Sequence, residues 1–180
     1  VAVGHKALEA NTTGETNTAI GSDALKANTT GRRNTAVGYQ ALLVATTAEG
    51  NTAFGAYAGD STTTGASNTF IGYDTAPANT TGANNVGLGA GSLHANTTAS
   101  YNTGLGASTL YTNTTGHSNV AVGKDALYYN TTGNYNVSVG RGCLDNNTTA
   151  SNNTAVGYNS LTANTTANSN TAVGMYALTS

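Results

Sequence analysis

The chain has 180 residues, of which only 8% are charged, and its formal net charge is −2. This balance excludes the basic surface that binds nucleic acid or acidic membranes. No apolar run approaches the ~20 residues that cross a bilayer, so we expect no membrane insertion. The 23 glycines, and the abundance of threonine, asparagine and alanine, favour a repetitive fibrous chain over a fold that encloses a catalytic pocket.

One unit of 17 residues repeats along the whole chain without insertion or deletion. We number the 17 positions from a recurring asparagine, and all residues that share a position form a column. A fixed short period is typical of solenoids, in which each unit contacts only its neighbours. Residues 1–180 therefore form a single array of about 10.6 repeats (180/17). Because the chain begins and ends within a unit, we expect a segment of a longer fibre. The asparagines of column 1 are Asn17, Asn34, Asn51, Asn68, Asn85, Asn102, Asn119, Asn136, Asn153 and Asn170.

Two apolar columns in each unit predict the local structure. Column 4 always holds a large apolar residue, often β-branched, and column 9 holds leucine except at Gly59 and Ala76. Such columns, separated by glycine turns, indicate two short strands per unit. A helical repeat would need apolar residues three and four positions apart. We therefore predict an all-β fold, a parallel β-solenoid (β-roll) of 17-residue coils that is left-handed and assembled as a homotrimeric fibre.

Alternation along the first strand predicts which residues face the interior. Columns 2 and 4 share a face, and the large residues of column 4 suggest that this face points inward. Columns 3 and 5 then point outward, yet they stay small, as in Ala36 and Gly38. Either the glycine of column 5 serves a turn, or the small face packs against another chain. Thin coils bury little surface alone, which favours a homo-oligomer, most commonly a trimer.

Stacked coils place equivalent side chains in straight ladders. In-register asparagines and threonines can then hydrogen-bond from coil to coil. Adjacent threonines in columns 13 and 14 point to opposite faces if the chain is extended there. Representative ladder residues are Asn34, Val37, Gly38, Leu42, Thr29 and Thr30, and again Asn119, Val122, Gly123, Leu127, Thr131 and Thr132.

Asn-Thr-Thr recurs in columns 12 to 14 and formally matches the N-glycosylation acceptor. A turn in which these side chains satisfy the backbone explains the period equally. The candidate glycosylation sites are Asn11, Asn28, Asn79, Asn96, Asn113, Asn130, Asn147 and Asn164.

Tyrosines gather in columns that we expect to face solvent. An aromatic row on a polar rod can stack against sugars or contact a partner, and packing between neighbouring coils is the alternative. The candidate surface contacts are Tyr101, Tyr111, Tyr128, Tyr129 and Tyr135.

We find no candidate catalytic, metal-binding or cofactor-binding residue, and we expect no enzyme. His5, His94 and His117 fall in three different columns, so they cannot converge on a metal ion, and we interpret them as single solvated histidines. Cys143 replaces alanine in its column, which predicts a small packed side chain. Pro77 cannot donate a hydrogen bond to a ladder, which predicts a local bend or edge.

The segments from Asn34 to Leu42 and from Asn153 to Leu161, with the recurring Asn-Thr-Thr, resemble repeats of phage tail-fibre proteins. Many of those proteins end in an endosialidase-type intramolecular chaperone. The Ala-Val-Gly core is also similar to the head repeats of YadA-like trimeric adhesins, which form left-handed parallel β-rolls from shorter units. The resemblance implies an extracellular location, on a virion tail fibre or a cell surface.

These observations predict a structural fibre or adhesin segment, a rigid shaft that also contacts a glycan or protein receptor on a host surface. Two alternatives stay open. Outward threonines on a β-solenoid can order water, which would make the chain an ice-binding protein, although columns 13 and 14 should supply one outward rank instead of two. An uncapped solenoid can also add coils end to end, giving a self-assembling surface filament that carries glycans.

Overall fold

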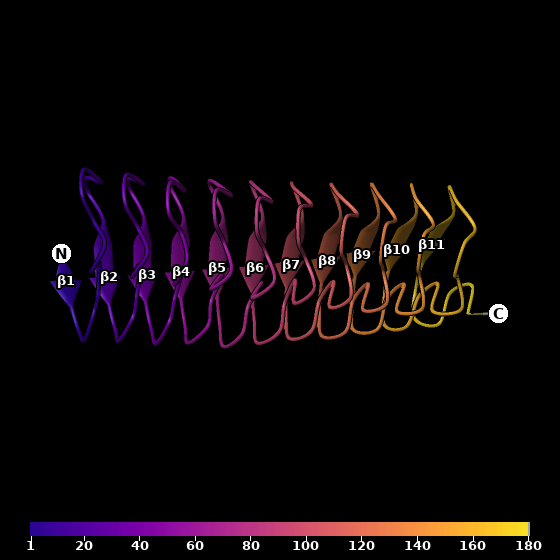
Figure 1. Cartoon of the computed structure of the whole chain (residues 1–180). Helices are drawn as coiled ribbons and strands as arrows, with labels where there is room; N and C mark the ends of the chain where they lie inside the picture. Colours follow the sequence, from indigo (N-terminus) through magenta and orange to yellow (C-terminus); the bar gives the residue numbers. More distant parts are fainter. Residues whose placement is uncertain (180) are drawn as a thin grey trace.

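The computed structural model describes residues 1–179 and shows a rod of stacked coils, with one terminus at each end (Figure 1). Eleven strands lie side by side in chain order in one sheet, and every neighbouring pair is parallel. Each coil contributes one strand, which covers columns 2 to 4. The strands are β1 (Ala2–Val3), β2 (Thr18–Ile20), β3 (Thr35–Val37), β4 (Thr52–Phe54), β5 (Thr69–Ile71), β6 (Val86–Leu88), β7 (Thr103–Leu105), β8 (Val120–Val122), β9 (Val137–Val139), β10 (Thr154–Val156) and β11 (Thr171–Val173).

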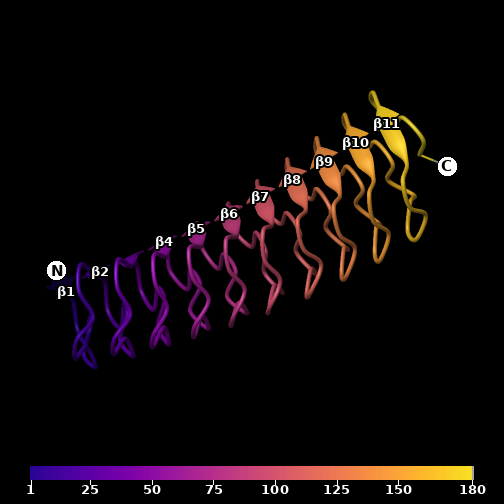
Figure 2. The same cartoon turned by 90° about the horizontal axis from the view of Figure 1, so that it is seen from above.

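The pairing confirms the predicted parallel β-solenoid. Thr18 pairs with Thr35 and Ala19 pairs with Ala36, so each residue lies next to its counterpart 17 residues later. The sheet also twists along the rod. In Figure 2 the strands are seen almost edge-on near β2 and face-on near β11, as expected from the twist of neighbouring strands.

The prediction of two strands per unit is wrong. The leucine of column 9 lies in a turn, where Leu25 and Leu42 have left-handed φ values of 50° and 49°. The turns nevertheless hydrogen-bond from coil to coil, because the N–H of Leu25 donates to the carbonyl of Ala41 at 3.0 Å. The N–H of Thr29 donates to Thr46 in the same way at 2.9 Å. Stacked turns thus replace the second strand.

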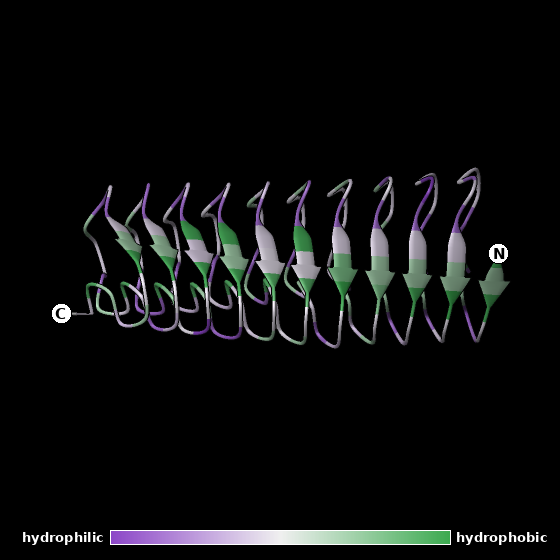
Figure 3. Cartoon of the chain, turned by 180° about the vertical axis from the view of Figure 1, so that it is seen from behind, coloured by the Kyte–Doolittle hydropathy of each residue, from purple (hydrophilic) through white to green (hydrophobic). Residues whose placement is uncertain are grey.

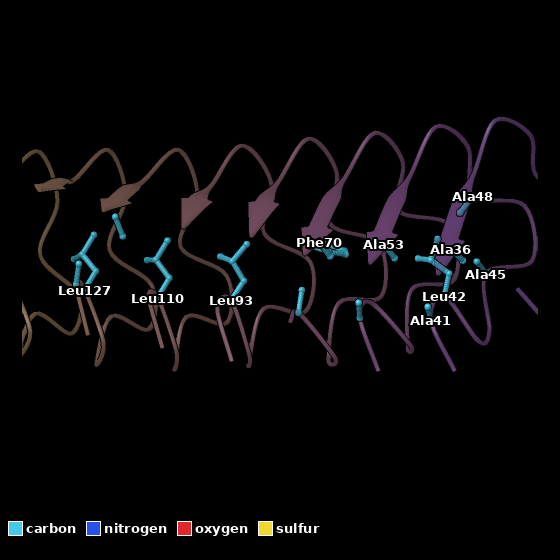
Figure 4. Packing of buried hydrophobic residues seen from close by; sticks show 14 of the residues in the cluster. Ala36, Ala41, Leu42, Ala45, Ala48, Ala53, Phe70, Leu93, Leu110 and Leu127 are labelled. Atoms are coloured by element: carbon cyan, nitrogen blue, oxygen red, sulfur yellow. The ribbon is translucent and has the colours of Figure 1, made fainter. Parts of the chain in front are cut away.

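The predicted facing of the strand is also wrong. The middle residue, column 3, points into the coil, where Ala19 and Ala36 are fully buried. Column 4 points out of the sheet, and Ile20 keeps 41% of its surface exposed. The interior is too narrow for two large columns on opposite sides. Alanine on the strand therefore faces the leucine of column 9, which comes from the other side of the coil (Figure 4).

One stretch of the core exchanges its large residue between the two sides. In β5, Phe70 replaces the usual alanine and is fully buried. Column 9 becomes small beside it, at Gly59 and Ala76. A Cβ atom added to Gly59 would lie 2.7 Å from the Phe70 ring. The core stays filled because the leucine is lost where the phenylalanine arrives.

The glycine of column 5 serves the turn and the stacking of coils. Gly89 has a φ of +132°, and an added Cβ atom would lie 2.6 Å from the carbonyl carbon of Gly106 in the next coil. Of the two explanations for this column, the structure therefore supports the turn. The Pro77 coil keeps its place in the stack, since β5 and β6 pair in full register on either side of it.

Candidate functional site

Two ladders of buried asparagines hold the coils together. In column 1, Asn34 Oδ1 accepts a hydrogen bond from the backbone N–H of Asn51 at 3.0 Å, and Asn34 Nδ2 donates to the Ala48 carbonyl at 2.7 Å. In column 12, Asn130 Nδ2 donates to Asn113 Oδ1 at 2.7 Å. Buried amides are costly unless satisfied, so this pattern explains why asparagine recurs.

The column 12 ladder bears directly on the glycosylation motifs. Asn28, Asn79, Asn96, Asn113, Asn130 and Asn147 are fully buried. Their Nδ2 atoms also donate to the carbonyl three residues later, as Asn113 does to Gly116 at 2.8 Å. In the folded coil these side chains therefore act as the turn asparagines of the alternative interpretation. At the two ends of the column, Asn11 and Asn164 are partly exposed and make the same turn contact.

The threonine pair of columns 13 and 14 divides between two environments. Thr131 is half-buried, and its hydroxyl donates to the Thr148 carbonyl of the next coil at 3.0 Å. Thr132 is exposed. Thr29 and Thr30 show the same division. These columns thus supply one outward rank of threonine.

The outer face of the sheet carries the least polar surface of the rod. We call column 4 the apolar strip. It contains no charged or polar residue in eleven coils, and several members protrude, including Phe54 with 56% and Leu88 with 47% of its surface exposed. Figure 3 shows this apolar row crossing the sheet from strand to strand. The apolar strip comprises Val3, Ile20, Val37, Phe54, Ile71, Leu88, Leu105, Val122, Val139, Val156 and Val173.

A row of aromatic rings lies on a different side of the coil, in column 10. The His94 ring stacks on Tyr111 with ring centres 4.5 Å apart, and Tyr111 stacks on Tyr128 at 4.9 Å with only 5° between the planes. Tyr129 meets Tyr128 edge to face at 4.7 Å. His94 also lies 3.3 Å from an oxygen of Asp74. His94 is therefore part of an aromatic stack, and the interpretation as a single solvated histidine is wrong for it.

An open pocket of about 280 Å³ ends this aromatic row, lined by Asp125, Tyr128, Tyr129 and Asp145. Partial burial raises the pKa of the Asp145 carboxyl, and the negative charge of Asp125 raises it further. Tyrosine faces beside carboxylates are groups that can contact sugar rings and hydroxyls. The other two tyrosine candidates, Tyr101 and Tyr135, lie apart from this pocket in column 17, and both are largely exposed.

No group of three or more histidine, cysteine, aspartate or glutamate side chains comes together for a metal ion within residues 1–179. His117 packs edge to face on Tyr135 at 5.0 Å. Cys143 is buried as predicted, and burial raises the pKa of its thiol. Over the same residues, no helix is long and apolar enough to cross a membrane.

Sequence reasoning missed the outer sheet face, although the chain carries a signal for it. Phenylalanine at Phe70 coincides with the loss of leucine at Gly59 and Ala76, which indicates that columns 3 and 9 share the interior. Comparison of the chain with protein-family models, curated proteins and solved structures finds no match.

Proposed function

We propose that this chain is the shaft of an extracellular fibre, on a virion or a cell surface, and that it holds a tip at a fixed distance from its base. One observation supports this most: all eleven strands share one sheet in unbroken register. Ten intervals between the strands, at about 4.8 Å each, give a rod about 48 Å long. Hydrogen bonds between successive coils resist bending along that length.

The buried polar ladders favour a mechanical role. Each asparagine of column 1 is bonded to the coils on both sides, so that bending the rod strains many charge-free hydrogen bonds at once. We further propose that the shaft works as a homotrimer, because a coil with one large core residue buries little apolar surface alone. The aromatic row from His94 to Tyr129 would then be a contact for a host-surface glycan or protein.

Immunogold electron microscopy of the source virions or cells, with an antibody raised against the 180-residue chain, tests the location and the role. Gold along thin surface fibres is the expected result. Gold inside cells, or on compact particles without fibres, would overturn the proposal. A glycan array probed with the chain tests the receptor contact, and signals that disappear in Tyr128→Ala and persist in Tyr101→Ala would assign the contact to the aromatic row.

Ice binding is a second candidate, because the outer sheet face offers two outward ranks. Thr18 and Ile20 stand two residues apart on one face, and most coils repeat this pair. The ranks are about 6.6 Å apart and repeat every ~4.8 Å, a regular array that can order water. However, Phe54 and Leu88 protrude from this face and interrupt its flatness. Thermal hysteresis with faceted ice crystals would favour this candidate, and its absence would exclude it.

A further inference from the structure

We propose that the apolar strip is the surface on which copies of this chain meet, side by side, parallel and in register. This inference rests on the proposed homo-oligomeric shaft and names the face that forms it. The face is the opposite of the one suggested by the small residues of columns 3 and 5. Those residues face the interior or the next coil, so they are not available to a partner.

Hydrophobicity and charge mark the apolar strip as a surface that needs a cover. All 14 lysines, arginines, aspartates and glutamates lie in columns 6, 7, 10, 16 and 17, and none lies in columns 2 or 4. Contiguous exposed apolar surface of several hundred Å² is rare on monomers and marks interaction sites. Tyrosines of column 6, among them Tyr39 and Tyr73, follow the strip at its edge with 45% and 61% of their surfaces exposed. An apolar centre with tyrosine at its border is the usual composition of a protein interface.

The size of the face agrees with a stable contact. Eleven three-residue strands make a face about 48 Å long and about 10 Å wide, which is about 500 Å² in projection. Stable interfaces bury about 800 Å² per partner. The tyrosines of column 6 and the threonines of column 2 extend the contact toward this value.

Periodicity identifies the occupant as a second copy of the same chain. The strip presents one apolar side chain every ~4.8 Å, and only a surface of the same period can repeat the contact at every coil. A symmetry axis along the rod brings each coil opposite its own counterpart, so Phe54 meets Phe54 and Val122 meets Val122. Because the sheet twists along the rod (Figure 2), copies joined in this way wind around each other.

Cysteine cross-linking of the full 180-residue chain tests the contact. Val122→Cys places a thiol in the strip, and Thr132→Cys places one on the exposed threonine column of the same coil. Both variants carry Cys143→Ala, which restores the residue usual in that column. A short bis-maleimide should link Val122→Cys into a species of twice the chain mass and leave Thr132→Cys unlinked. Equal linking of both variants, or none, would overturn the proposal.

Register is tested by mixing two tagged chains, Val122→Cys and Ile71→Cys, whose thiols lie three coils apart. In-register copies should give homotypic links and lose the mixed product. A mixed product as abundant as the homotypic ones would contradict the register.

Light scattering with size-exclusion chromatography provides the second measurement. The wild type should elute as an oligomer, whereas Val122→Lys should lose the oligomer peak and keep its β-type circular dichroism. Thr132→Lys should remain oligomeric. A monomeric wild type that is still a rod about 48 Å long would overturn this inference and leave the shaft intact. A compact monomer would overturn both, and a monomeric rod with thermal hysteresis would assign the face to ice.

Discussion

At the scale of single residues, the molecule depends on buried amides and on strained turn positions. Column 9 leucines and several residues of columns 7 and 17 hold left-handed φ values, for example Leu93 at 56° and Asn84 at 57°. Non-glycine residues adopt this conformation at a cost of about 1 kcal/mol or more each. The cost is offset by burial of leucine and by ladders that run through every coil.

Asn102→Ala should destabilise the rod by about 3 kcal/mol. Asn102 Oδ1 accepts hydrogen bonds from the backbone and side-chain amides of Asn119 at 3.0 and 3.2 Å, and Asn102 Nδ2 donates to the Gly116 carbonyl at 2.8 Å. The substitution leaves these buried groups unpaired, at about 1–3 kcal/mol each. Chemical denaturation measures the loss. Asn84→Ala, at an exposed position, is the control, and an equal effect of both variants would contradict the role of the ladder.

The buried phenylalanine offers a test of how the interior is filled. Phe70→Ala should lower the free energy of unfolding by about 3–5 kcal/mol, because it leaves a cavity beside Gly59 and Ala76. The triple variant that adds Gly59→Leu and Ala76→Leu rebuilds the usual core and should recover most of the loss. Denaturation curves of both variants decide the matter. A triple variant less stable than Phe70→Ala would show that columns 3 and 9 do not share the interior.

Two partly buried carboxyls give stability a defined dependence on pH. Burial raises the pKa of Asp60 and of Asp145 above the ordinary 3.8. The folded state therefore binds more protons than the unfolded state above pH 3.8, so these groups lower stability as pH rises through that window. Asp145→Asn should raise the thermal midpoint at pH 7 and flatten its fall between acidic and neutral pH. Glu49→Gln should not, and an unchanged slope in Asp145→Asn would contradict the assignment.

At the scale of elements, each coil is one interchangeable unit. Coils contact only their neighbours, so stability is a sum over coils and their interfaces. Deleting residues 102–118 joins Tyr101 to Asn119 and preserves the order of columns. This variant should fold and lose only one coil, with a proportionally smaller unfolding transition.

The matched control removes residues 103–118, one residue fewer. It shifts every later side chain by one column, which turns the interior residues of the following strands outward. Calorimetry and circular dichroism should show a folded first variant and a strongly destabilised second one. Equal stability of the two would mean that the columns do not define the coils.

Much of this element was predictable. The return of asparagine from Asn17 to Asn170 requires only stacking in register, and parallel pairing follows from it. The facing of β3 was not predictable from alternation alone, because alternation allows either Ala36 or Val37 to point inward. Isolated glycines at Gly50, Gly59, Gly91 and Gly142 coincide with columns of left-handed φ, a sign that these columns are turns. The aromatic row was predicted only in part, because His94 joins it from a coil without tyrosine in that column.

At the scale of the whole molecule, the rod separates its chemistry by side. Polar ladders and alanines fill the interior, charged residues occupy five outer columns, and the apolar strip runs along the sheet. The same regularity that builds the shaft repeats the strip at every coil. We therefore expect the contact between copies to strengthen with the number of coils.

The axial rise per 17 residues, measured by cryo-electron microscopy or fibre diffraction of the purified chain, tests the central claim most directly. The stacked coils predict one strand spacing, about 4.8 Å, for every unit, and a rod about 48 Å long from β1 to β11. A rise that differs from the strand spacing, or a compact particle with no axial repeat, would contradict the structure and every function proposed from it.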